Sequence, residues 1–315
     1  MDKVDIEKWL KAHKVVNYMI NEDMCVDVIG DVNLSKMDLT EISVKFGNVS
    51  GNFLCSDNKL GDLVGCPDVV GGNFYCYNNK LTSLLGCPSS ICGEFSCYNN
   101  KLSSLLGCPE IILGNFLCDK NKLKSLKFCP QEVGGYFHCQ SNCLDSLKWC
   151  PQYITGDFDC SLNNLSSLKD CPIEVSEGFY CYNNNLTSLE HCPIKVGKDF
   201  NCRGNKLLTL EYGPVSVVGN FDCDRNNLTT LLGCPDTIIG DFYCIENELS
   251  TMEFCPGSVG GNFHCSDNKL SESELFLYEC TAEQVYNYYK NKNLNEDLKN
   301  RLGEKVDVSV KIKKI

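Results

Sequence analysis

Apolar positions recur along the chain with one fixed spacing of 21 residues. A phenylalanine marks each repeat; cysteine follows it by two positions, asparagine by five and leucine by seven, while Val or Ile stands four positions before it. The marker residues are Phe53, Phe74, Phe95, Phe116, Phe137, Phe158, Phe179, Phe200, Phe221, Phe242 and Phe263. A constant period of this length predicts a solenoid, in which every repeat stacks on its neighbours.

Within one repeat, the alternation of Phe and Cys predicts a short strand that turns both side chains inward. The asparagine predicts a turn in which its amide satisfies backbone groups, so that the eleven asparagines form a hydrogen-bonded ladder. A proline stands fourteen positions after ten of the phenylalanines, where it excludes a helix interior or a central strand. We therefore expect a parallel β-sheet on the concave face and extended or 3-10 chain on the convex face.

The internal consensus V-x-G-x-F-x-C-x-x-N-x-L-x-x-L-x-x-C-P resembles that of leucine-rich repeats, with Phe and Cys replacing the first two leucines of L-x-L-x-x-N-x-L. Its second half, N-x-L-x-x-L followed by P-x-x-V, is similar to the short repeats of bacterial effector proteins. The resemblance covers about residues 28–272. It implies a leucine-rich-repeat horseshoe, a repeat solenoid with a helix-free convex face, and a bacterial or bacteriophage source.

The sequence divides into three parts. Residues 1–48 predict an N-terminal cap, with a short amphipathic helix near residues 5–13 and a degenerate repeat in which Val32, Leu34 and Met37 replace Phe, Cys and Asn. Residues 49–272 form eleven repeats. Residues 273–315 predict a C-terminal cap with one helix from Thr281 to about 292, a second near 294–302, and a basic tail or strand after Gly303. Solenoid ends need atypical caps of this kind.

The 24 cysteines follow the repeat rather than a disulfide pattern. Eleven follow Phe by two positions and nine precede proline. Equivalent positions on neighbouring coils lie about 4.8 Å apart in a parallel sheet, whereas a disulfide favours Cβ atoms separated by about 3.8 Å. We expect ladders of free, buried thiols in a reducing compartment. Cys143 stands where several other repeats have Lys, so we expect it to be exposed.

The chain carries a formal net charge of −12, which divides into −15 for residues 1–280 and +3 for residues 281–315. An acidic body disfavours direct binding to nucleic acid and favours partners with a basic surface. The sequence has no run of 18 apolar residues, so it predicts no membrane span, and its start lacks the apolar core of a signal peptide. We expect a cytoplasmic protein, located in the host-cell cytoplasm if a bacteriophage encodes it.

The outward positions of the predicted strands vary, and they supply the candidate binding residues. An aromatic cluster and its continuation comprise Tyr75, Tyr77, Tyr98, Leu117, Tyr136, His138, Tyr180 and Tyr182. An acidic stripe on the C-terminal half comprises Asp157, Asp159, Asp199, Asp222, Asp224 and Asp241. Tyrosines on a rigid sheet are typical anchors of protein interfaces, and carboxylates beside them attract a Lys- or Arg-rich partner.

Both groupings also have a purely structural interpretation. Tyrosine favours strands, and tyrosines on neighbouring strands stabilise one another, while Asp and Asn keep an open sheet soluble. In that case the functional surface lies on a rim, on the convex side or on a cap.

Catalytic and metal chemistry find little support in the sequence. His13, His138, His191 and His264 fall in no nucleophile or metal motif. The acidic stripe lacks the spacing of an EF-hand loop, and cysteines separated by 20 residues do not match a zinc finger. We expect no enzyme activity, no cofactor and no metal.

These observations favour a non-catalytic scaffold that binds a protein with a basic surface. In a phage or a pathogen, the natural task of such a scaffold is to inhibit a host defence protein by occlusion or charge mimicry. The alternative is a structural, self-assembling protein, in which a basic tail contacts the acidic body of another copy to give a homo-oligomer. A metal- or nucleotide-binding protein is a weaker idea, because no motif supports it.

Overall fold

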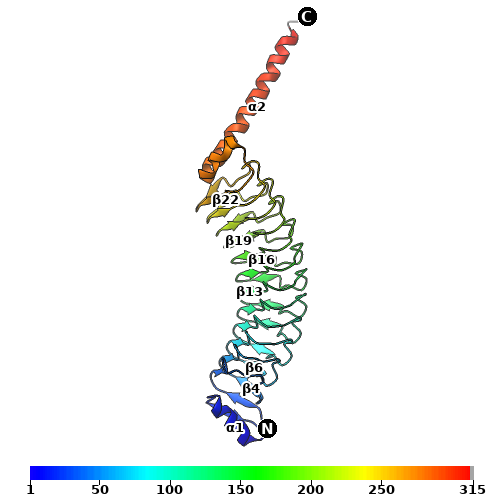
Figure 1. The fold of residues 1–315 in the computed structure, drawn as a ribbon, viewed down its shortest axis with the longest axis vertical. Helices are drawn as coiled ribbons and strands as arrows, with labels where there is room; N and C mark the ends of the chain where they lie inside the picture. Colours follow the sequence, from blue (N-terminus) through cyan, green and yellow to red (C-terminus); the bar gives the residue numbers. More distant parts are fainter. Residues whose placement is uncertain (313–315) are drawn as a thin grey trace.

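The computed structural model describes the backbone of residues 1–312 and the side chains of residues 1–297 and 299. The chain winds into a long, gently curved stack of coils, with strands gathered along one side and loops along the other (Figure 1). Partner residues on neighbouring coils are 21 apart, as in the pairing of Phe116 with Phe137. The 21-residue repeat therefore corresponds to one turn of a solenoid, as the sequence predicted.

Two sheets run along the stack, where the sequence predicted one. Their strands pair in parallel except the first two, Tyr18–Ile20 and Val26–Val28, which pair antiparallel. The additional sheet forms where Val or Ile precedes the marker phenylalanine by four positions. Its thirteen strands are β1 (Tyr18–Ile20), β2 (Val26–Val28), β4 (Phe46–Val49), β6 (Val69–Val70), β8 (Ser90–Ile91), β10 (Ile111–Ile112), β12 (Glu132–Val133), β14 (Tyr153–Ile154), β16 (Glu174–Val175), β18 (Lys195–Val196), β20 (Ser216–Val217), β22 (Thr237–Ile238) and β24 (Ser258–Val259).

The second sheet contains the marker phenylalanines, and we call its outward side the strand face. Its twelve strands are β3 (Val32–Asn33), β5 (Phe53–Leu54), β7 (Phe74–Tyr75), β9 (Phe95–Ser96), β11 (Phe116–Leu117), β13 (Phe137–His138), β15 (Phe158–Asp159), β17 (Phe179–Tyr180), β19 (Phe200–Asn201), β21 (Phe221–Asp222), β23 (Phe242–Tyr243) and β25 (Phe263–His264). The degenerate repeat keeps the register, because Val32 pairs with Phe53.

The core is a set of columns rather than one central cluster. The phenylalanines from Phe53 to Phe242 are fully buried, and the rings of neighbouring coils from Phe53 to Phe263 lie 5.1 to 6.0 Å apart. Columns of Cys and Leu are buried beside them. Burial of each phenylalanine contributes about 1.5–3 kcal/mol, and the offset rings add attraction between coils.

The asparagine ladder is confirmed, and Asn163 illustrates it. Its Nδ2 donates to the carbonyl oxygens of Cys160 in its own coil and Cys139 in the preceding coil, each at 3.1 Å. Its Oδ1 accepts from the backbone N–H of Leu144 at 2.9 Å. Each such asparagine therefore joins two coils, and most of them do so at a buried position.

The loop side consists of turns and extended chain, and residues 1–271 contain no 3-10 helix. Twelve positions after each marker phenylalanine from Phe53 to Phe242 the backbone adopts a left-handed conformation, shown by a φ of 97° at Gly107 and 80° at Trp149. Glycine occupies this position without strain, whereas a bulky residue does not. In several coils a bulky residue nevertheless occupies this position, as Phe128 and Trp149 do.

A short helix covers the first coil. Helix α1 (Lys3–Ala12) starts after Asp2, whose side chain accepts a hydrogen bond from the Asp5 N–H at 2.9 Å. Ile6 and Leu10 are buried, and the ring of Trp9 lies 6.2 Å from that of Phe46. This helix confirms the amphipathic segment expected near residues 5–13 and shields the end of the Phe column.

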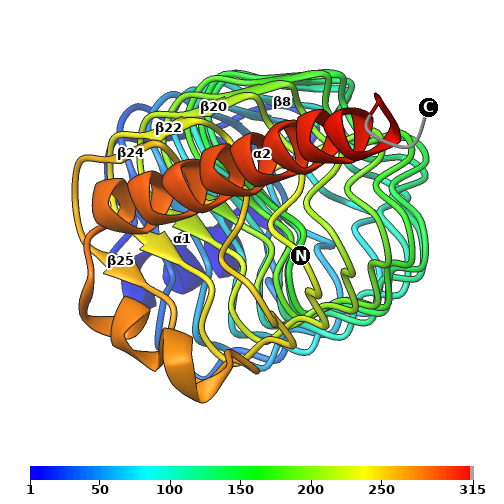
Figure 2. The same ribbon diagram turned by 90° about the horizontal axis from the view of Figure 1, so that it is seen from above.

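The C-terminal cap differs from the expectation. A 3-10 helix, η1 (Glu272–Glu279), precedes a single helix, α2 (Ala282–Ile312). The expected second helix with an end at Gly303 was wrong, and so was the possible strand, since residues 305–312 are helical; the rest of the basic tail, 313–315, lies outside the described residues. Helix α2 begins against the last coil and then projects beyond it (Figure 1), passing over the coils when seen along the stack (Figure 2).

Candidate functional site

The aromatic residues predicted from the sequence meet on the strand face in two contacting groups. The ring of Tyr77 lies 5.8 Å from that of Tyr75 and 4.6 Å from that of Tyr98, nearly parallel to the latter. Tyr136 and His138 stack at 5.9 Å on the fourth coil of the cluster. All five rings are partly accessible, so the two groups form a surface of stacked rings.

Leu117 lies on the strand face between the two aromatic groups. It is half-buried and pairs with His138 on the next coil. Tyr180 and Tyr182, also half-buried, continue the face two coils further on. Burial raises the pKa of Tyr75, Tyr98 and Tyr180 above its ordinary value, so these phenols remain neutral hydrogen-bond donors.

Three carboxylates of the acidic stripe hold the coils together. Asp157, Asp199 and Asp241 stand directly before a marker phenylalanine, and each accepts a hydrogen bond from a backbone N–H on the next coil, at 2.6 to 2.7 Å. Asn residues at the same position elsewhere accept equivalent bonds, such as the one from the Asn73 N–H to Asn52. The sequence analysis missed this second ladder, whose signal was the recurrence of Asn and Asp before Phe.

Two carboxylates expected to face outward are buried instead. Asp159 is 9% exposed and Asp224 is 5% exposed. Asp159 accepts hydrogen bonds from the backbone N–H and the hydroxyl of Ser161. Asp224 accepts from the backbone N–H of Ile245 at 2.7 Å. Asp159 folds back onto the chain beside it, because a short acidic side chain satisfies local N–H groups well, whereas Asp224 bonds the backbone of the next coil.

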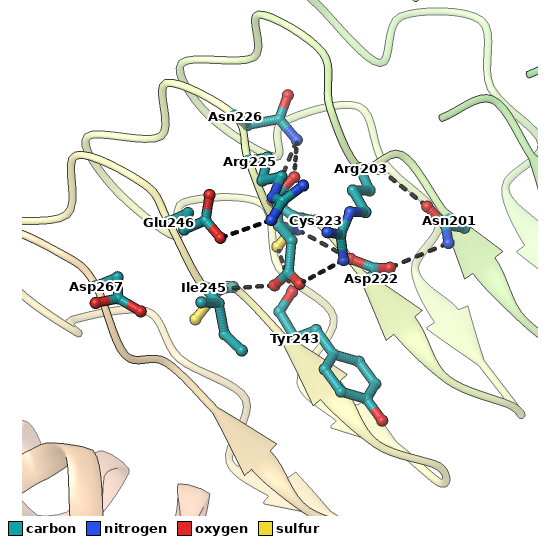
Figure 3. Close-up of polar contacts among 12 residues, drawn as sticks. Asn201, Arg203, Asp222, Cys223, Arg225, Asn226, Tyr243, Ile245, Glu246 and Asp267 are labelled. Atoms are coloured by element: carbon teal, nitrogen blue, oxygen red, sulfur yellow. Dashed lines mark hydrogen bonds and ion pairs between the residues drawn. The ribbon is translucent and has the colours of Figure 1, made fainter. Parts of the chain in front are cut away.

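A charged cluster that includes Arg203 and Asp222 spans three neighbouring coils (Figure 3). Arg203 donates to Asp224 at 3.1 Å, and Asn201 donates to Asp222 at 3.1 Å. Burial, together with the nearby Asp222 carboxylate, raises the pKa of Asp224 to about 6. Burial also raises the pKa of Asp222. One guanidinium thus lies beside two carboxylates, and the cluster has a negative balance.

The strand face continues beyond the predicted residues. Tyr243 stacks on His264 at 4.6 Å, and its hydroxyl donates to Asp241 at 2.8 Å. That bond and one from the Asn262 N–H lower the pKa of Asp241. Asp119, one coil before His138, is 7% exposed. These residues occupy the same repeat positions as the predicted ones, so position alone was the signal that could have included them.

The ligand-type side chains of the described residues are not arranged as a metal centre. Among them, no group of three or more His, Cys, Asp or Glu side chains is placed to hold a metal ion. All 24 cysteines are free, and burial raises the pKa of thiols such as Cys76 and Cys118 well above its ordinary value. Such thiols are poor nucleophiles and poor ligands. Cys143 is exposed as expected, and so is Cys92.

None of the helices, within the part of the chain that the structure describes, combines the length and the apolar character needed to cross a membrane.

Comparison with protein-family models gives no match, and comparison with curated proteins gives none either. Among solved structures, the chain is similar to YopM, a leucine-rich effector protein from Yersinia pestis, with a TM-score of 0.53, 19% identity, and coverage of 76% of this chain and 75% of YopM. It is also similar to the functional domain of InlJ from Listeria monocytogenes, which includes a cysteine ladder; the TM-score is 0.51 and the identity 19%, over 77% of this chain. The matched part spans about half of the InlJ chain (54%). The fold is that of a leucine-rich-repeat solenoid with a short, 21-residue repeat.

Proposed function

We propose that the chain is a non-catalytic scaffold that binds another protein on its strand face. The observation that carries this proposal is the surface of stacked, accessible rings formed by Tyr75, Tyr77, Tyr98, Tyr136 and His138. The fold does not require aromatic residues there, because equivalent positions of other repeats hold Ser, Asp, Asn or Arg. Large amphipathic rings held by a rigid sheet lose little conformational entropy on binding.

Charge supports a partner with a basic surface. The chain has a net charge of −12, and Asp157, Asp199, Asp222 and Asp241 remain partly accessible on the strand face. Carboxylates that the fold holds in place attract lysines and arginines without reorganising. Asp159 and Asp224 are buried, so they contribute to the negative electrostatic potential of this face but not to direct contacts with a partner.

The proposal extends to inhibition. A rigid, acidic and aromatic surface that catalyses no reaction acts on its partner by covering a functional surface of that partner. In a phage or a pathogen, the partner we propose is a host defence protein, blocked by occlusion or by charge mimicry. The similarity in fold to a leucine-rich effector protein is consistent with this role.

Replacement of three tyrosines tests the proposal. The variant Tyr77→Ala, Tyr98→Ala, Tyr136→Ala should lose the partner that the wild-type chain captures from lysate of its natural host, while its melting temperature falls by only a few degrees, about 2–4 °C per kcal/mol. The matched control replaces Tyr153, Tyr212 and Tyr286, which are exposed elsewhere, and should retain the partner.

The outcomes of this capture separate the candidate functions. A partner retained by the strand-face variant but lost by the control variant would reject the strand face as the binding surface. Recovery of only further copies of the chain would favour a self-assembling protein instead. The projection of α2 beyond the stack gives that second candidate its structural support (Figure 1).

A further inference from the structure

The loop side of three neighbouring coils is strongly basic although the chain as a whole is acidic. The segments 78–86, 99–107 and 120–128 contain six lysines and neither Asp nor Glu. These lysines are Lys80, Lys101, Lys120, Lys122, Lys124 and Lys127, and all are exposed. Four of them lie within the single segment 120–128, which makes it the centre of positive charge.

Nothing in the fold calls for these lysines. None of the six is in an ion pair with a side chain that the structure describes. Like charges on neighbouring coils, about 4.8 Å apart in a parallel sheet, repel one another. Other repeats place Cys143, Asn164 or Asn185 at the position of Lys122, so the fold accepts neutral residues there. A partner of opposite charge would account for the lysines.

An apolar row accompanies the lysines on the same turns. Val64, Leu85, Leu106 and Phe128 belong to consecutive coils and are 69%, 59%, 47% and 45% exposed. Phe128 has a φ of 70° at the position that Gly107 occupies in the coil before it. The chain therefore places a ring, with Lys127 Nζ 4.9 Å from its centroid, where glycine would be free of strain.

We propose that this lysine surface, formed by the six lysines and the row Val64, Leu85, Leu106 and Phe128, binds a short polypeptide segment that mixes acidic and apolar residues. It is a second binding surface, independent of the strand face. Three coils span only about 10 Å, which suits three or four extended residues. Three members of the row are aliphatic and offer contacts to leucine or isoleucine side chains. Phe128 is its single ring, too few for the successive stacking of bases that single-stranded nucleic acid favours.

The surroundings of the lysine surface favour a peptide over nucleic acid. Asp57 and Asp62 lie on the coil of Val64, just before the three coils that carry the lysines, and Asp145 lies on the coil after them. A nucleic acid carries charge along its whole length, so it would meet these carboxylates on leaving the three coils. A short acidic segment would end before reaching them.

Fluorescence anisotropy at low salt tests the inference. The probe is a fluorescein-labelled twelve-residue peptide in which Asp-Leu-Glu-Asp is flanked on each side by Gly-Ser-Gly-Ser. The variant Lys120→Gln, Lys122→Gln, Lys124→Gln, Lys127→Gln should weaken binding roughly tenfold, as expected for the loss of three exposed ion pairs. A control variant with Gln at Lys169, Lys195, Lys206 and Lys269 should bind as the wild type does. The variant Leu85→Asn, Leu106→Asn should also bind more weakly.

Several results would overturn the inference. One is equal binding by the wild type and the Lys120–Lys127 variant, and another is loss of binding in the control variant to the same extent. Preference for a twelve-residue oligothymidylate over the acidic peptide would replace the proposed partner by single-stranded nucleic acid. A neutral probe, with Asn and Gln replacing its acidic residues, should bind more weakly. If it binds as tightly as the acidic probe, charge is not what holds the peptide. Circular dichroism of each variant excludes misfolding as the cause.

Discussion

Single buried asparagines connect the coils of this solenoid. Asn163 makes hydrogen bonds with two coils through both atoms of its amide, and its exposure is only 7%. Without this amide, the backbone N–H of Leu144 would lose its partner at a buried position. The carbonyls of Cys139 and Cys160 would each lose one of two donors and keep the other, which comes from the ladder asparagine of the coil before or after. Each unsatisfied buried group costs about 1–3 kcal/mol.

Replacement of Asn163 by Ala should therefore lower the free energy of unfolding by roughly 1–3 kcal/mol, since the buried N–H of Leu144 loses its partner. Its neighbour Asn164 is exposed and provides the matched control, for which we expect a change within about 0.5 kcal/mol. Urea unfolding followed by circular dichroism measures both. Equal midpoints for the two variants would show that the ladder does not carry the stability assigned to it.

The outward-facing residues show where prediction from the sequence reached its limit. The inward direction of Phe, Cys and Leu followed from their spacing, because a strand or a tight turn leaves little choice. The outward Asp side chains were different. Whether Asp159 reaches solvent or folds back onto Ser161 depends on its rotamer and on the next two residues, which a repeat consensus averages away.

The turns on the loop side limit which residues a coil can accept. Gly107 has a φ of 97°, and a Cβ atom built on it would lie 2.5 Å from the carbonyl oxygen of Leu84. No flexible side chain can move aside there, since the obstacle is backbone. Gly61, on the same side of an earlier coil, has open space around the corresponding Cβ position.

Gly107→Ala should thus destabilise the chain by about 1–3 kcal/mol, through left-handed strain and contact with the preceding coil. Gly61→Ala should leave stability unchanged or raise it by up to about 1 kcal/mol, because alanine restricts the unfolded chain. Thermal unfolding of the two variants, side by side with the wild type, makes the comparison. A Gly107→Ala variant as stable as the wild type would refute this view of the turns.

Secondary-structure elements were predictable in proportion to their regularity. The Phe strands and helix α1 follow from strong periodic patterns. The strands of the additional sheet, such as β6, contain two residues in most coils, too few for a periodic signal. At the C-terminus, Thr281 and Gln284 cap one another as the sequence indicated. The end of α2 was not predictable, because glycine inside a helix costs only about 1 kcal/mol and Gly303 does not stop it.

The whole molecule is a stack whose sides differ in chemistry. The strand face carries stacked tyrosines and carboxylates, while the loop side of three coils carries lysines beside exposed aliphatic side chains. Each difference arises at repeat positions whose side chains do not pack in the core and therefore vary from coil to coil. The consensus therefore predicts the solenoid but not its surfaces, which depend on what successive coils place next to one another.

Hydroxyl-radical footprinting of the chain, alone and bound to its captured partner, tests the central claim most directly, because tyrosine rings react according to their accessibility. The account predicts that the partner protects Tyr77, Tyr98 and Tyr136 on the strand face. It predicts unchanged reactivity of Tyr153 and Tyr212, which are 66% and 70% exposed elsewhere. Protection of Tyr153 and Tyr212, with the strand-face tyrosines as reactive as in the free chain, would contradict it.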